Sequence, residues 1–172
     1  MFFLLFLLVN SFFIRKFEYQ NKLIMQEFQA KFSLKVNQTT YPKIKITQSK
    51  VAYETILNYY DESIEIYESF YLVLLNTANE TIGFVKLSQG GITGTVVDLR
   101  LLMKYVLDTL ASGVIIAHNH PSGNLKPSEA DKIITKKINS ALKLIDVTLL
   151  DHLIITPYGF LSFADEGILT FE

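Results

Sequence analysis

Apolar residues recur at helical spacing in three segments of the chain. The clearest is 98–111, where apolar side chains return every three or four positions and so line one face of a helix. Asp98 stands where the N-cap of this helix is expected, and Gly113 stands where the helix should end. Segments 49–60 and 128–144 have the same periodicity. The pattern therefore predicts three amphipathic helices.

Short apolar runs between these helices predict β-strands. Segments 70–76 and 81–89 are rich in β-branched and aromatic residues, and the turn residues 77–80 between them indicate a hairpin. Further strands are expected at 114–117, 147–150, 152–156 and 160–163. Strands interleaved with amphipathic helices predict an α/β sandwich, in which helices flank a mixed β-sheet.

The N-terminal stretch differs from the rest of the chain. Residues 1–14 are almost wholly apolar, but they fall short of the roughly 20 residues that a membrane-spanning helix needs. Basic residues follow this run instead of preceding it, which argues against a signal peptide. We favour the hypothesis that 1–24 is an apolar leader foreign to the native protein, with Met25 as the natural start. A membrane anchor and a packed or swapped helix are the alternatives.

The remaining length suits a single domain. Residues 25–45 are polar with alternating stretches, which predicts an N-terminal arm that is extended or forms a strand. We expect the domain itself to occupy residues 46–172. With 172 residues, 49% of them hydrophobic, the chain can bury a sizeable core but would be cramped as two domains.

Charge and cysteine content restrict the chemistry. Sixteen basic against seventeen acidic residues leave a net charge of −1, so no global charge attracts the chain to nucleic acid or to an anionic membrane. The sequence has no cysteine, which excludes disulfides, thiol nucleophiles and cysteine-ligated zinc. This composition fits a reducing compartment, and we expect a cytoplasmic location. Any metal site must use histidine or carboxylate ligands.

One segment, HNHPSGNLKPSEAD, combines such ligands. His118 and His120 directly follow an apolar strand, and side chains at i and i+2 of an extended backbone point to the same side, while Asn119 faces away. Asp131 falls in the first turn of the next helix, where a carboxylate is favoured. Three such ligands leave a fourth position for water, which is typical of catalytic zinc. The cofactor predicted from these residues is therefore Zn²⁺.

Each part of this pattern also has a simpler interpretation. Ser128 and Asp131 form a capping-box-like helix start that needs no metal, and 121–123 is typical of a turn. An isolated H-x-H pair is often a coincidence. The combined pattern H-x-H-P-x6-S-x-x-D is much rarer than its parts, and it favours the metal site.

The combined pattern resembles a known family. HNHPSG followed by PS-x-x-D is similar to the signature of RadC-like proteins, a bacterial branch of the JAB/MPN metalloprotease superfamily, whose JAMM motif is H-x-H…S-x-x-D. ESFYLVLLN, TVVDLR and LLDHLIIT also resemble RadC, so the resemblance covers roughly residues 45–165. It implies a JAB/MPN, cytidine-deaminase-like sandwich. The helix-hairpin-helix region of full-length RadC is not found, and we therefore expect a short form.

The resemblance also implies roles for further residues. Glu68, before the strand at 70–76, matches the glutamate that acts as general base, although three nearby acids compete for this role: Glu62, Glu65 and Glu80. Ser128 matches the serine that donates a hydrogen bond to the developing oxyanion, with helix capping alone as the alternative. Asp151 and His152 match a RadC element, and we expect them to support the site or the fold without ligating zinc.

Three classes of function remain open from the sequence. The first is a zinc-dependent peptidase or isopeptidase of JAMM type, acting on an unidentified peptide or isopeptide. The second, suggested by the family name, is a DNA-repair-associated protein, for which the sequence supplies only a lysine-rich helix: Lys132, Lys136, Lys137 and Lys143. The third is a non-catalytic interaction module, against which the complete His–His–Asp set argues.

Overall fold

The computed structural model describes residues 42–60, 62–90 and 97–169. These residues belong to one compact unit, Thr40–Glu172. The predicted leader at 1–24 and nearly all of the predicted arm at 25–45 lie outside the described residues. At the start of the described part, Lys45 forms an antiparallel bridge with Glu80.

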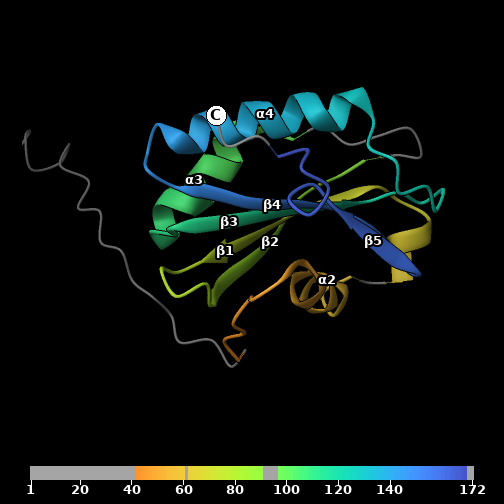
Figure 1. The fold of residues 1–172 in the computed structure, drawn as a ribbon, viewed down its shortest axis with the longest axis horizontal. Helices are drawn as coiled ribbons and strands as arrows, with labels where there is room; N and C mark the ends of the chain where they lie inside the picture. Colours follow the sequence, from red (N-terminus) through yellow and green to blue (C-terminus); the bar gives the residue numbers. More distant parts are fainter. Residues whose placement is uncertain (1–41, 61, 91–96, 170–172) are drawn as a thin grey trace, which may run out of the picture. The chain divides into compact units, whose positions relative to one another are not determined.

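Five strands form one mixed sheet in the order β2-β1-β3-β4-β5 (Figure 1). β1 (Ser69–Leu75) is antiparallel to β2 (Thr81–Gln89) and to β3 (Gly113–Asn119). β4 (Thr148–Thr156) runs parallel to β3, and β5 (Gly159–Ser162) pairs antiparallel with β4. Every residue of β1 and β3 is buried, as expected for central strands that are covered on both faces.

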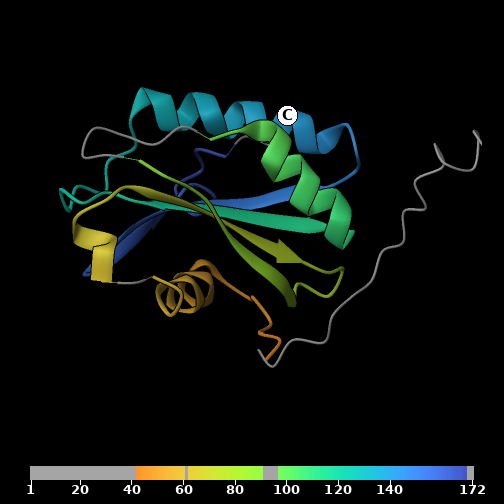
Figure 2. The same ribbon diagram turned by 180° about the vertical axis from the view of Figure 1, so that it is seen from behind.

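Helices cover both faces of the sheet (Figures 1 and 2). α3 (Leu99–Thr109) and α4 (Glu129–Lys143) pack on one face, and α2 (Ser49–Leu57) packs on the other. A short 3₁₀ helix, η1 (Glu62–Glu65), precedes β1. This arrangement confirms the predicted α/β sandwich with a mixed sheet flanked by helices. None of the helices in the described part of the chain is long and apolar enough to cross a membrane.

The predicted helix starts agree with the structure, but one predicted helix end does not. The Asp98 side chain accepts a hydrogen bond from the Arg100 N–H and caps α3. At the other end of α3, Leu110 rather than a glycine takes the left-handed conformation, with φ of 52°. Gly113 is instead the first residue of β3, where a Cβ would lie 2.9 Å from Leu150 Cδ1. Close packing against β4, and not helix termination, therefore explains this glycine.

The two strands predicted at 147–150 and 152–156 are in fact one strand, β4. Its pairing with β3 shifts by one residue, because Val114 is opposite Leu149 while Ile115 is opposite Asp151. Leu150 is thus the extra residue of a β-bulge. If β4 paired regularly with β3 from Leu149 onward, His152 would be opposite Ala117 and would face α2, since a one-residue shift in register moves every later side chain to the other face. The bulge places His152 on the face covered by α3 and α4.

Candidate metal centre

Side chains at the end of β3 point alternately to the two faces of the sheet. Val114 and Ile116 face α3 and α4, whereas Ile115 and Ala117 belong to the cluster beneath α2. By the same alternation His118 points toward α4, and Asn119 points toward the α2 face. The backbone N–H of His120 donates to the Ile155 carbonyl at 3.1 Å, which holds the chain in line beyond the strand.

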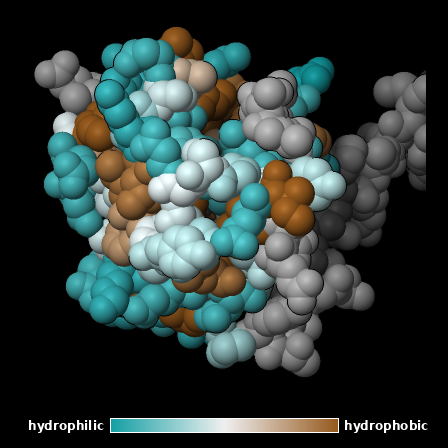
Figure 3. Space-filling view, turned by 90° about the vertical axis from the view of Figure 1, so that its right-hand side faces the viewer, coloured by the Kyte–Doolittle hydropathy of each residue, from teal (hydrophilic) through white to brown (hydrophobic). Residues whose placement is uncertain are grey.

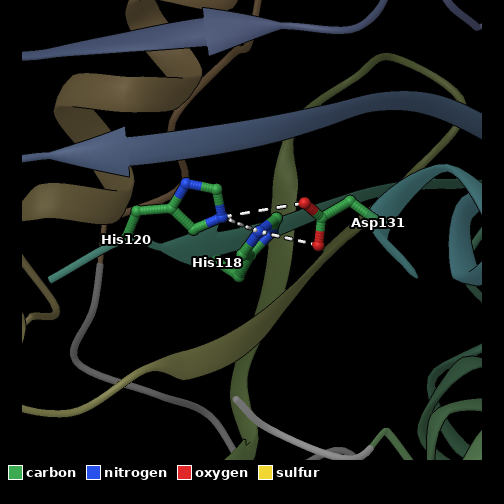
Figure 4. A group of neighbouring side chains, drawn as sticks. All are labelled: His118, His120 and Asp131. Carbon is green, nitrogen blue, oxygen red and sulfur yellow. Dashed lines mark hydrogen bonds and ion pairs between the residues drawn. The ribbon is translucent and has the colours of Figure 1, made fainter. Parts of the chain in front are cut away.

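The structure brings His118, His120 and Asp131 together, as Figure 4 shows. His118 Nε2 lies 3.0 Å from His120 Nε2 and 3.2 Å from Asp131 Oδ1, and His120 Nε2 lies 3.7 Å from Asp131 Oδ2. A tetrahedral zinc ion about 2.0–2.1 Å from each ligand atom would separate those atoms by about 3.3 Å. Two nitrogens and a carboxylate at these separations are compatible with one ion of this size.

The other ring nitrogens of the two histidines point away from this centre and have partners of their own. His120 Nδ1 lies 2.5 Å from the Asn124 carbonyl oxygen, which can only accept, so Nδ1 carries the proton and Nε2 presents a lone pair. His118 Nδ1 lies 2.8 Å from His152 Nε2. Outward hydrogen bonds of this kind are typical of histidines that ligate a metal.

Electrostatics within the group favour a cation between the three side chains. Burial alone would raise the pKa of Asp131, but the neighbouring His118, His120 and Ser128 side chains hold this pKa well below its usual range. The hydrogen bond with Asp131 raises the pKa of His120 against the opposing effect of burial. Both shifts favour a positive charge among these three side chains.

Ser128 is engaged with Asp131 in a capping box at the start of α4. Its hydroxyl donates to Asp131 Oδ2 at 2.7 Å and accepts from the Asp131 N–H at 3.2 Å. The single hydroxyl hydrogen is thus already directed at the carboxylate. In this arrangement Ser128 orients Asp131. For Ser128 to act as the expected oxyanion donor, its hydroxyl would have to rotate.

Glu68 stands directly before β1, next to the strand that carries the histidines. Phe70 is opposite His118 in the register, and the charge of Glu68 contributes to the raised pKa of His120, after the larger effects of Asp131 and Asn124. Glu68 is partly buried. Glu68 therefore lies near enough to His120 to influence its charge, and its role as general base stays a prediction.

Two of the three competing acids are poorly placed. Glu80 follows the far end of β1, and seven residues at about 3.3 Å each put it roughly 20 Å from Glu68. Glu65 is exposed and accepts a hydrogen bond from the Tyr158 hydroxyl at 3.3 Å. The side chain of Glu62 lies outside the described residues.

Asn119 fixes the segment that carries Glu68. Its Oδ1 accepts from the Ser69 N–H at 2.8 Å, and its Nδ2 donates to the carbonyls of Ile64 and Tyr67 at 2.6 and 2.8 Å. The side chain is fully buried. From the sequence, Asn119 was expected only to face away from the histidines. A polar amide at such a position needs hydrogen-bond partners on the other face of the sheet, and this was the sign available in the sequence.

His152 and Asp151 have different surroundings. His152 is fully buried and contacts His118, and its pKa is well below the usual value because of burial and the neighbouring His118. Asp151 accepts from the Ser162 hydroxyl and the Ala164 N–H, at 2.6 and 3.0 Å, so it joins β4 to the segment after β5. His152 therefore supports the candidate site, and Asp151 supports the fold.

Thr135 was not among the residues predicted from the sequence. Its hydroxyl lies 2.6 Å from His152 Nδ1, on the side opposite His118. The available sign was its position one helical turn after Asp131, which places both residues on one side of α4.

The candidate centre lies at the end of the sheet where the loop after β3 and the tip of β5 meet. Figure 3 looks onto this end, on which hydrophilic and hydrophobic residues are intermixed in the described part. The side chains of Asp131 and His120 are 13% and 16% exposed, whereas that of His118 is 1% exposed. The group is therefore accessible to solvent from one side.

A mixed sheet flanked by helices, with two histidines at the end of a central strand and an aspartate in the first turn of α4, is consistent with a JAB-type domain. A family model described as "RadC-like JAB domain" matches residues 46–168, so the chain belongs to the RadC-like JAB family. This result confirms the resemblance seen in the sequence motifs.

Curated relatives agree with this assignment. A UPF0758 protein of Flavobacterium johnsoniae is 51% identical over 124 residues, which cover 72% of this chain and 53% of the relative. A UPF0758 protein of Porphyromonas gingivalis is 42% identical over 125 residues, covering 72% of this chain and 54% of the relative. The chain thus spans about half the length of the curated relatives it matches.

Proposed function

We propose that the chain is a zinc-dependent hydrolase of JAMM type that cleaves peptide or isopeptide bonds. One observation carries this proposal: the free nitrogens of His118 and His120 and the Asp131 carboxylate converge with separations of 3.0–3.7 Å. Convergence of acceptor atoms without a cation is electrostatically unfavourable, and three protein ligands are typical of catalytic zinc.

Zinc bound there would supply a Lewis acid that polarises a carbonyl and lowers the pKa of water from 15.7 to about 7. Glu68 would act as general base and take one proton from the attacking water. It would then deliver this proton to the leaving amine, so that the C–N bond breaks and the base is regenerated. Its position beside His120 supports this role.

Neighbouring residues hold Asp131 and the segment that carries Glu68 in position. Ser128 and the start of α4 hold the Asp131 carboxylate, and Asn119 holds the backbone before β1. If the Ser128 hydroxyl turns from Asp131 toward a substrate, it also becomes a donor for the oxyanion, worth about 3 kcal/mol when well aimed. For the DNA-binding alternative, the charge of Lys132 on α4 is already partly neutralised, because its Nζ pairs with Glu129 at 2.6 Å.

The test uses the whole chain, with elemental analysis for zinc and pooled internally quenched peptides and isopeptide-linked peptides as substrates. Wild type should contain stoichiometric zinc. Glu68→Gln should keep the zinc and the fold but lose about 100-fold or more of the hydrolysis rate, because only the proton transfer is removed. Glu65→Gln and Glu80→Gln serve as matched controls and should retain activity. A metal-free wild type, or a fully active Glu68→Gln, would contradict the proposal.

A further inference from the structure

A chain of hydrogen bonds runs from His118 through the interior back to α4. His118 Nδ1 lies 2.8 Å from His152 Nε2, and His152 Nδ1 lies 2.6 Å from Thr135 Oγ1. The Thr135 hydroxyl donates to the backbone carbonyl of Asp131 at 2.5 Å. All three side chains are buried, with exposed fractions of 1%, 0% and 4% for His118, His152 and Thr135.

The hydrogen bond from the Thr135 hydroxyl to the Asp131 carbonyl determines which atom donates in each of the other hydrogen bonds. A backbone carbonyl can only accept, so the single hydroxyl hydrogen of Thr135 must point at the Asp131 oxygen. Toward His152 the hydroxyl can then only accept, and His152 Nδ1 must carry a hydrogen. A neutral His152 has no hydrogen on Nε2, which therefore accepts from His118 Nδ1–H. His118 Nε2 is left with its lone pair.

We propose that Thr135 is a positioning residue that selects the tautomer of His118 through His152. The selected tautomer directs the bare Nε2 of His118 at Asp131 and His120. The hydrogen-bond chain begins and ends on candidate ligands, because it connects the His118 ring to the backbone of Asp131. It therefore couples the end of β3 to the first turn of α4.

Two features support this direction over the reverse one. In the reverse direction the Thr135 hydroxyl would donate to His152, and two acceptor oxygens, those of Thr135 and Asp131, would face each other at 2.5 Å. A charged His152 would also be costly, because the ring is fully buried and a buried charged ring loses its hydration. His120 Nδ1–H donates to the Asn124 carbonyl in the same way, so a neutral His120 also presents a bare Nε2.

The tautomers can be measured directly in the metal-free chain, because the sequence has only three histidines. Long-range ¹H–¹⁵N correlation spectra with ¹⁵N-labelled histidine distinguish protonated from bare ring nitrogens. In wild type and Thr135→Ser, we expect hydrogen on Nδ1 of both His118 and His152. In Thr135→Val, His152 Nδ1 loses its acceptor, so we expect both rings to switch to the Nε2–H form. Nε2–H on His118 in wild type, or unchanged tautomers in Thr135→Val, would overturn the inference.

Zinc affinity supplies the second measurement, by competition with a chromophoric chelator. Thr135→Val should weaken zinc binding by about 10–100-fold, as is usual for the partner of a ligating histidine, and Thr135→Ser should restore it. Thr55→Val is a matched control, because Thr55 is also 4% exposed and donates to the carbonyl four residues earlier, but in α2. Wild-type zinc affinity in Thr135→Val would contradict the positioning role.

The importance of this tautomer for catalysis rests on the proposed function, but its measurement does not. If wild type binds no zinc, the proposed function fails, and the tautomers of the metal-free chain still decide on the role of Thr135. If zinc binds and the tautomers do not respond to Thr135→Val, only the present inference fails.

Discussion

Replacing Asn119 by alanine should test how the segment that carries Glu68 is held. The fully buried amide of Asn119 makes three hydrogen bonds, with Ser69, Ile64 and Tyr67, all of which lie before or at the start of β1. Alanine removes all three bonds without touching either histidine. The buried Ser69 N–H and the carbonyls of Ile64 and Tyr67 would then lose these partners.

The expected cost follows from these contacts. A buried hydrogen bond contributes about 0.5–1.5 kcal/mol net, and so the loss of three should destabilise the fold by about 2–4 kcal/mol. The freed segment can also move Glu68 away from His120. Zinc content should stay at the wild-type level, while hydrolysis should fall by about tenfold or more, since general-base catalysis depends on hydrogen-bond reach.

Urea unfolding, elemental analysis and the peptide assay measure these three effects separately. Asn76→Ala is the matched control: the Asn76 side chain also makes three hydrogen bonds, with Ala78 and Glu80, but in the turn at the far end of β1. Asn76→Ala should lower the free energy of unfolding by less than Asn119→Ala does, because that turn is partly exposed. It should leave the rate of hydrolysis unchanged. A change of less than about 0.5 kcal/mol in Asn119→Ala, or wild-type hydrolysis, would refute the reasoning.

Further predictions concern the metal, its pH dependence and DNA. His118→Ala or Asp131→Ala should lose stoichiometric zinc, and full occupancy of both variants in elemental analysis would contradict the ligand assignment. Zinc occupancy should fall below about pH 6, because protons compete for neutral histidine and Asp131 raises the pKa of His120. In equilibrium dialysis, occupancy that does not change between pH 5 and 7 would argue against histidine ligands. The chain should bind duplex DNA weakly or not at all near physiological salt; tight, salt-sensitive binding in an anisotropy titration would show the opposite.

The sequence predicted the elements whose periodicity is long and regular. α3 and α4 were predicted with their N-caps at Asp98 and Ser128, because both the apolar spacing and the capping residue pointed to the same start. The break predicted within β4 falls at the bulge, where the alternation of side chains changes phase. A local change of phase looks like a strand end in the sequence, and only the pairing with β3 shows that the strand continues.

The residues predicted for the candidate site are brought together, while the groups that hold them were less visible in the sequence. His118, His120 and Asp131 share a motif, and so their proximity followed from local spacing. The contacts of Asn119 and Thr135 join residues that are 50–55 and 17 positions apart in the chain. Such contacts depend on strand order and register, which a single sequence does not specify.

The bulge at Leu150 makes β4 tolerant of losing one residue at that point. Leu150 is half-buried, so another apolar residue should replace it readily. Its deletion would leave Asp151 alone opposite Ile115, so the two strands would pair regularly and His152 would stay opposite Ile116. The candidate site therefore depends on the phase of β4 after the bulge, and not on the extra residue itself.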